Sequence, residues 1–306
     1  MRIIFMGTPE FAVASLDALL QAGCNIVAVV TAPDKPAGRG QKIHESAVKQ
    51  FAVEKGIEVL QPIKLKDPEF HEKLKSLNAD LQVVVAFRML PEAVWNMPPK
   101  GTINLHASLL PYYRGAAPIN WAVINGEKET GVTTFLLQHE IDTGNILFSE
   151  KVPVTETETA GDIHDKLMHT GAGLLVKTVK SIESGNYTPV AQSQLASGTK
   201  EFPHAPKLFK EDCLINWNQP AIKVYNLIRG LSPYPTAYTV FKEKSLKIYF
   251  AELLAKEPGI QPGGFLTDDK TYLHFACLDG FISVKDIQLE GKKRMNVEEF
   301  LRGFRA

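Results

Sequence analysis

Cysteine is scarce in this chain of 306 residues, and the three that occur stand far apart, at positions 24, 213 and 277. An odd and scattered set provides no framework of disulfides, and none of its pairs has the close spacing of metal ligands. We therefore expect reduced thiols that are buried or idle, and we expect no metal site.

Net charge and long apolar runs are also missing. The 34 Lys and Arg residues balance 34 Asp and Glu residues, so no overall field attracts a polyanion, and any contact with RNA must come from local basic patches. The apolar run in residues 1–7 is too short for a signal peptide, and no later run approaches the roughly 20 residues of a membrane span. Gly7 stands alone after this run, which indicates a strand-to-helix turn rather than a glycine-rich dinucleotide site.

The first half of the chain alternates short apolar runs with helical patterns. Strands are expected at 2–6, 25–31, 58–60 and 81–87, and helices after Pro9, at 45–55 and at 67–77. Thr8 is expected to cap the first helix. This rhythm predicts an α/β fold with a doubly wound, Rossmann-like and mostly parallel sheet.

The second half has a different character. Residues 188–206 are rich in Pro, Gln, Ser, Thr and Gly and are expected to form a linker. After a partly helical stretch, short β-prone runs at 236–241, 246–253, 272–277 and 281–289 predict a small antiparallel barrel. We therefore expect a domain at 1–187, a linker at 188–206 and a second domain at 207–306.

Three polar residues stand where chemistry is expected. Asn104 and His106 follow a β-prone run and are two residues apart, so both side chains face the same side at a strand's carboxyl end, where α/β sheets bind ligands. Asp142 follows the next predicted strand, at 131–137. An amide, an imidazole and a carboxylate suit acyl transfer through an oxyanion, and the absence of a Ser or Cys beside a His favours direct attack by an acceptor amine. A structural His–Asp hydrogen bond would show the same spacing, so spacing alone leaves both interpretations open.

The surrounding residues carry a resemblance to a known family. The pattern Asn104-x-His106-x-Ser108-Leu-Leu-Pro111-x-Tyr113-Arg114-Gly115, followed by Asp142-Thr143-Gly144, resembles the formyltransferases that use 10-formyltetrahydrofolate. Within that superfamily the chain is similar, over nearly its whole length, to the enzymes that formylate methionyl-tRNA. The resemblance implies an OB-like second domain. It implies that Asn104, His106 and Asp142 are catalytic and that Ser108, Leu109, Leu110 and Pro111 line the folate site.

Basic residues suggest where RNA would bind. The segment 32–42 is rich in Gly and Pro and is expected to be a loop without regular structure. The family has an inserted loop here that wedges at the tRNA acceptor stem, which implies that Lys35, Arg39 and Lys42 bind tRNA and that Arg39 matches the key arginine of the family. A solvated connection is the alternative. The chain departs from the family at Arg88, where a glycine is usual.

The resemblance therefore implies a cytoplasmic, monomeric enzyme without a metal, which transfers a formyl group from 10-formyltetrahydrofolate to the α-amine of methionyl initiator tRNA. One alternative is an enzyme that formylates a small amine, such as an amino sugar nucleotide or glycinamide ribonucleotide. Another is a folate- or RNA-binding protein without catalysis. The basic loop at Lys35 to Lys42 and the lysines of the predicted barrel argue against the first alternative. The presence of the amide, imidazole and carboxylate together argues against the second.

Overall fold

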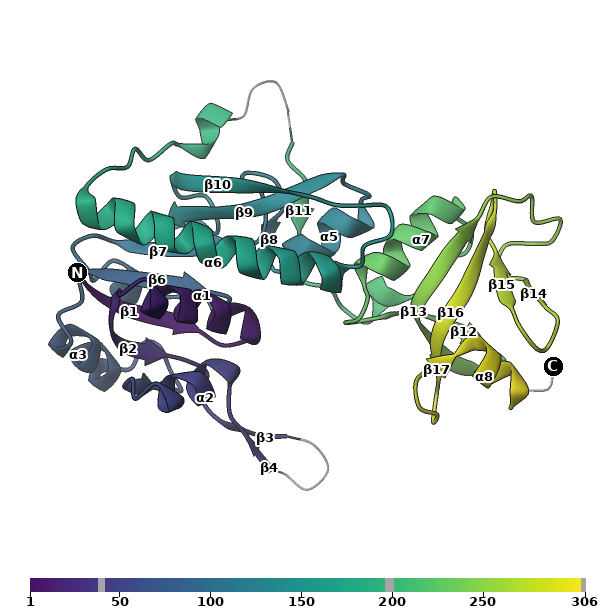
Figure 1. Ribbon diagram of the computed structural model, residues 1–306, viewed down its shortest axis with the longest axis horizontal. Coiled ribbons are helices and arrows are strands. Elements are labelled where there is room, and N and C mark those ends of the chain that lie inside the picture. Colours follow the sequence, from purple (N-terminus) through teal and green to yellow (C-terminus); the bar gives the residue numbers. More distant parts are fainter. Residues whose placement is uncertain (38–41, 196–200, 304–306) are drawn as a thin grey trace. The chain divides into compact units, whose positions relative to one another are not determined.

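The computed structural model describes residues 1–37, 42–195 and 201–303, and the chain forms two compact units (Figure 1). The first unit comprises residues 1–114, 131–152 and 165–203, and the second comprises 115–130, 153–164 and 204–306. Each unit is therefore assembled from separate stretches of the sequence. The functional division into a domain at 1–187, a linker at 188–206 and a domain at 207–306 remains a prediction.

A sheet of seven strands forms the centre of the first unit. In spatial order the strands are β10 (Ile146–Pro153), β9 (Glu129–Leu136), β7 (Thr102–His106), β6 (Leu81–Val85), β1 (Arg2–Gly7), β2 (Asn25–Val30) and β5 (Val59–Leu60). The pairs from β7 to β5 are parallel, and β9 runs antiparallel to β7. Strands β1 and β6 are almost wholly buried, as their uninterrupted apolar runs require. The predicted mostly parallel α/β sheet is confirmed.

Helices cover this sheet, and α6 runs along it in Figure 1. They are α1 (Glu10–Gln21), α2 (Ala47–Glu54), α3 (Pro68–Ser76), the short α4 (Glu92–Trp95) and α6 (Ala160–Ser184). The side chain of Thr159 accepts a hydrogen bond from the Asp162 N–H while Asp162 accepts from Thr159, a reciprocal cap that begins α6. The prediction that Thr8 caps α1 is wrong. Pro9 holds the N-cap position in an extended conformation and has no side-chain donor or acceptor.

The segment around the basic residues differs from the prediction. It was expected to lack regular structure, yet β3 (Lys35–Ala37) and β4 (Lys42–His44) form a two-stranded antiparallel ribbon, with Lys35 opposite His44. A two-stranded ribbon consists only of edge strands, and an edge tolerates a proline because one side of each strand makes no ladder hydrogen bonds. Pro36 therefore did not exclude a strand.

Part of the segment expected to be a linker is also structured. Val190 exchanges two backbone hydrogen bonds of 2.8 Å with Ile146, the first residue of β10. A short 3-10 helix, η1 (Gln192–Leu195), follows, and β11 (His204–Ala205) pairs with β8 (Arg114–Gly115). The polar composition of this stretch concealed these contacts.

The second unit is built on an antiparallel sheet in the order β12 (Ala237–Phe241), β13 (Lys244–Leu254), β16 (Phe281–Leu289), β15 (Leu273–Ala276) and β14 (Phe265–Thr267), with β17 (Met295–Asn296) beside β16. Register shifts near Phe250 interrupt the ladder of the two longest strands, β13 and β16, and such bulges increase local twist and curl the sheet. The antiparallel arrangement predicted for this part is confirmed.

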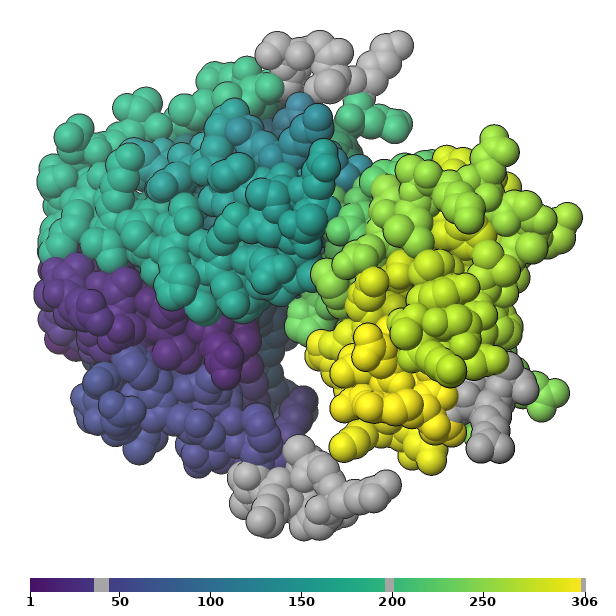
Figure 2. All heavy atoms as spheres, turned by 45° about the vertical axis from the view of Figure 1, so that its right-hand side comes forward, coloured from purple at the N-terminus to yellow at the C-terminus, as the bar shows by residue number. Residues whose placement is uncertain are grey.

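Helices α5 (Pro118–Ile124), α7 (Ala221–Gly230) and α8 (Val297–Arg302), with the 3-10 turn η2 (Glu211–Cys213), complete the second unit. Its core includes a stacked pair, Trp217 and Phe275, with ring centroids 4.7 Å apart. Figure 2 shows most of the C-terminal residues, in yellow, gathered on one side of this unit. Within the ranges given above, no helix has the length and apolar character needed to cross a membrane.

The thiol of Cys277 provides a test of this core. Burial raises the pKa of Cys277 to about 12, so the folded protein keeps the proton at pH values where the unfolded chain, with its ordinary value near 9.0, has lost it. The stabilising contribution of the protonated thiol is therefore complete below pH 9 and is lost as the pH rises toward 12. We expect Cys277→Ala to flatten the decline of unfolding free energy between pH 9 and 11 by up to about 1.4 kcal/mol per pH unit, measured by urea denaturation. Identical slopes for the two proteins would contradict this account.

Candidate active site

Strand β7 positions two of the expected residues. It lies between β6, where Val84 is opposite Asn104, and β9, where Thr133 is opposite His106. Asn104 is half-buried and His106 is buried. Because the strand is held by hydrogen bonds on both edges, the two side chains have a fixed separation along one face of the sheet.

The imidazole of His106 has a defined orientation. Its Nε2 lies 2.9 Å from the carbonyl oxygen of Tyr113, and a carbonyl only accepts, so Nε2 carries a proton and donates it. The other ring nitrogen, Nδ1, lies 3.9 Å from the Oδ2 atom of Asp142. This separation is longer than a hydrogen bond, so the carboxylate acts on the ring as a nearby charge. The structure thus brings His106 and Asp142 together as the sequence predicted.

The side-chain amide of Asn104 forms no hydrogen bond with any residue in the described parts of the chain. A half-buried amide without a protein partner can donate to a ligand atom at no cost to the fold. Its neighbours on the strand, Ile103 and Leu105, are buried in the apolar interior. Asn104 is therefore available to bind an oxygen on the same face as His106.

A tight turn presents Asp142. This residue has a left-handed backbone with φ of 55°, which Asp tolerates better than most residues. Two residues later, a Cβ atom at Gly144 would lie 1.6 Å from the carbonyl oxygen of Leu136, so the close approach of turn and strand requires glycine. The Asp142-Thr143-Gly144 sequence is thus explained by backbone geometry.

Sequence reasoning missed one contributor to the turn. The buried side chain of Gln192 donates hydrogen bonds to the carbonyl oxygens of Asp142 and Gly144, and it accepts from the guanidinium of Arg114. Gln192 lies in the stretch expected to be a linker, and its polar surroundings gave no signal that it was buried. Arg114 did appear in the sequence pattern, without a role.

The segment expected to line a folate site follows His106 directly. Ser108 is fully buried and its hydroxyl donates to the Tyr112 carbonyl at 2.6 Å. Leu110 packs in a small apolar cluster with Phe135 and Ile146, and Pro111 is buried. Leu109 is half-buried. In this structure these side chains mainly shape the backbone beside His106.

The structure describes two of the three basic residues that are expected to bind tRNA. Lys35 is exposed at the start of β3, and the backbone of Lys42 begins β4. Arg39 lies outside the described residues. Arg88 donates hydrogen bonds to the carbonyl oxygens of Pro62 and Ile63 and so connects two loops. Burial lowers the pKa of its guanidinium.

The second unit gathers lysines that the sequence separates. Leu246 pairs with Leu289, and the Glu290 N–H donates to the Ser245 carbonyl, so the start of β13 lies beside the end of β16. The exposed lysines of this region flank that junction at positions 242, 244, 247, 292 and 293. The pairing therefore turns two short basic stretches into one surface.

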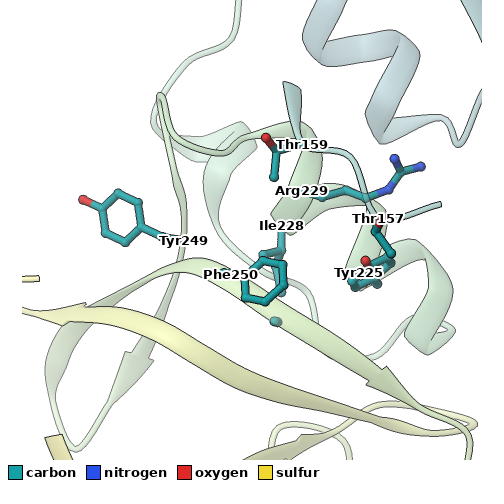
Figure 3. A pocket seen from close by; sticks show the side chains of 8 residues that line it. Thr157, Thr159, Tyr225, Ile228, Arg229, Tyr249 and Phe250 are labelled. Carbon is teal, nitrogen blue, oxygen red and sulfur yellow. The ribbon is translucent and has the colours of Figure 1, made fainter. Parts of the chain in front are cut away.

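A shallow hollow also occurs in the second unit, between α7, β13 and residues 157–159 (Figure 3). Arg229 lies at its edge, and its guanidinium donates to the carbonyls of Thr155 and Glu158 and to the Asn226 side chain. Burial lowers the pKa of Arg229. Because its donors are used to hold backbone, Arg229 has a structural part in this unit.

Acidic, histidine and cysteine side chains do not assemble elsewhere into a metal centre: within the described residues, no group of three or more is placed to hold an ion. The polar groups that the structure places at the candidate site are the amide of Asn104, the imidazole of His106 and the carboxylate of Asp142.

Comparison with known proteins defines the class. A family model described as formyl transferase matches residues 1–179, and a model of the formyl transferase C-terminal domain matches residues 207–305. The chain is thus a formyltransferase with both parts of that enzyme class. Its fold resembles that of an N-formyltransferase from Helicobacter canadensis, solved with folinic acid and dTDP-3-aminofucose, with a TM-score of 0.66 at 22% identity over 92% of this chain and 98% of that one.

A second fold neighbour is HypX from Aquifex aeolicus, solved with tetrahydrofolic acid, with a TM-score of 0.64 at 18% identity; the match covers 98% of this chain and 47% of that one. Among curated proteins, methionyl-tRNA formyltransferase of Bacteroides fragilis is 53% identical over 99% of this chain and 95% of its own length. At that identity and coverage, the chain belongs to the methionyl-tRNA formyltransferase family.

The glycine requirement at position 144 can be tested directly. Gly144→Ala should lower the unfolding free energy by about 1–3 kcal/mol, because the new Cβ meets a backbone oxygen that cannot move without disturbing β9. The measurement is urea denaturation followed by circular dichroism.

Gly173→Ala is the matched control. A Cβ at this position in α6 meets no atom within 4 Å, so we expect stability to be unchanged or to rise by about 0.5–1 kcal/mol. Equal effects of the two substitutions would show that the close approach at Gly144 is not the constraint described.

Proposed function

We propose that this protein transfers the formyl group of 10-formyltetrahydrofolate to the α-amine of methionyl initiator tRNA, in the cytoplasm, with Asn104, His106 and Asp142 as its catalytic residues. The observation that carries the assignment of residues is the half-buried, unpartnered amide of Asn104 on the strand that also holds His106 facing Asp142. Membership of the family supports the choice of reaction.

The residues fit a formyl donor. The reaction needs hydrogen-bond donors where negative charge develops on the formyl oxygen, and the Asn104 amide supplies one without titrating. The Nε2 atom of His106 is occupied by the Tyr113 carbonyl, so Nδ1 is the ring atom that can donate to the oxyanion when it carries a proton. The folate supplies a formyl group attached to nitrogen, a carbon open to attack by an amine.

Bonds and protons balance without another reactant. The amine nitrogen of methionine forms a bond to the formyl carbon, and the bond from that carbon to the folate nitrogen breaks. Asp142 orients the ring of His106 and helps to remove the proton that the amine loses, and the folate nitrogen gains a proton as it leaves. The segment Ser108, Leu109, Leu110 and Pro111 would shape the folate site beside His106.

The first experiment supplies purified protein with labelled 10-formyltetrahydrofolate and one of three acceptors: methionyl initiator tRNA, free methionine or a small amine such as an amino sugar nucleotide. We expect label to reach the charged tRNA alone. Transfer only to the small amine would support formyl transfer but refute tRNA as the acceptor. Tight RNA binding without turnover would refute catalysis.

The catalytic roles predict large losses of rate. Asn104→Ala and Asp142→Ala should each lower kcat by roughly a hundredfold or more, the usual cost of removing an oxyanion donor or an acid–base group. Single-turnover formylation measures the chemical step. Asn186→Ala, at an exposed position after α6, is the control and should retain the wild-type rate. Near-normal turnover of either site variant would refute its role.

The basic ribbon predicts a loss of tRNA affinity instead. Lys35→Ala, and likewise Arg39→Ala or Lys42→Ala, should weaken binding of methionyl-tRNA and lower the slope of log affinity against log salt by about one, as for one lost phosphate contact. Binding is measured by filter retention at several salt concentrations. Lys75→Ala on α3, also exposed, should leave the slope unchanged. An unchanged slope in all three variants of the segment 32–42 would exclude these contacts.

A further inference from the structure

The side chain of Gln192 makes an unusually complete set of hydrogen bonds for a residue outside the regular sheet. Its Nε2 donates to the carbonyl oxygen of Asp142 at 2.8 Å and to that of Gly144 at 2.9 Å. Its Oε1 accepts from Nε and Nη2 of Arg114 at 3.1 Å and 2.5 Å. Both amide hydrogens and both lone pairs of the oxygen are thus used.

This network fixes the orientation of the amide. Exchanging its oxygen and nitrogen would point two N–H groups at the Arg114 guanidinium, which has no acceptor, and an oxygen at two carbonyl oxygens. Arg114 therefore determines which end of Gln192 faces the turn. Gln192 itself is buried, so these bonds do not compete with bulk water.

The backbone holds Gln192 in place on the other side. Val190, two residues earlier, is joined to Ile146 by a pair of hydrogen bonds, and Ile146 begins β10 immediately after the turn. The segment 190–192 consequently makes a clamp of four hydrogen bonds to residues 142–146. Two run from the Gln192 side chain to the turn, and two join the backbones of Val190 and Ile146.

We propose that Gln192, oriented by Arg114, is a positioning residue that holds the Asp142 turn in its reactive geometry. The inference rests on the proposed function, in which Asp142 acts through His106. Gln192 acts through the turn backbone, so its loss should reduce the chemical step and leave binding of the folate and of tRNA nearly unchanged.

Gln192→Glu is the most informative variant. A carboxylate keeps the pairing with Arg114, has nearly the same shape, and replaces two donors with an oxygen that repels the carbonyls of Asp142 and Gly144. We expect kcat for formylation of methionyl-tRNA to fall at least about tenfold, with KM for both substrates within about twofold of wild type. Gln194→Ala, at an exposed position in the same 3-10 turn, is the matched control and should behave as wild type.

A second measurement does not depend on any substrate. In Gln192→Glu, backbone amides in residues 141–147 should exchange hydrogen about tenfold faster than in Gln194→Ala, measured by mass spectrometry, because the turn opens more often. If the glutamate variant fails to fold, Arg114→Met tests the same clamp, since Gln192 then keeps its donors but loses the group that orients them.

The outcomes separate the two proposals. Wild-type protein that does not formylate methionyl-tRNA would refute the proposed function, while the exchange experiment would still report on the clamp. Active wild type with kcat of Gln192→Glu within twofold, or equal exchange in the two Gln variants, would overturn the positioning role. A rise in KM with kcat unchanged would also overturn it, because the residue would then serve binding.

Discussion

The position of β7 between parallel β6 and antiparallel β9 is the constraint on which the site depends. Hydrogen bonds on both edges fix the register, so Asn104 lies opposite Val84 on one side and Phe135 on the other. A shift by one residue would exchange the side chains facing each side of the sheet and place Leu105 where the amide and imidazole now stand. Such a slip would turn the amide and the imidazole toward the apolar interior that Leu105 now fills, which makes the observed register the stable one.

The carboxylate is held by a different kind of structure. Asp142 belongs to a turn that no sheet ladder contains, and a turn alone would leave its side chain free to move relative to His106. Close contact at Gly144 limits the turn on one side, and the Gln192 amide holds it on the other. The strand β7 therefore fixes the positions of Asn104 and His106, whereas hydrogen bonds from Gln192 hold the turn that carries Asp142.

The difference between a strand, which has a local sequence pattern, and a turn held by a distant residue explains what the sequence could predict. Buried parallel strands appear as apolar runs, and Asn104 and His106 share a face because strand periodicity is local. The contact of Gln192 with Asp142 spans 50 residues, and nothing local marks a glutamine among polar neighbours as buried. The pairing of β3 with β4 could not be predicted, because the Gly and Pro residues of the sequence 32–42 indicate a turn but not whether the flanking residues pair. Asp142 could be placed near His106 because it follows the strand expected at 131–137, whereas its catalytic role is implied by the resemblance.

In the proposed mechanism the amide, imidazole and carboxylate meet only the reacting atoms, which are the same for any primary amine. The choice of acceptor must then be made elsewhere on the protein. With a net charge of zero, the chain cannot attract RNA by its overall field, so discrimination has to come from local features. The pairing of β13 with β16 gathers five exposed lysines that the sequence holds in two groups, and the ribbon adds Lys35. A small amine would leave such basic surfaces without a ligand, and this favours a polyanionic acceptor such as tRNA.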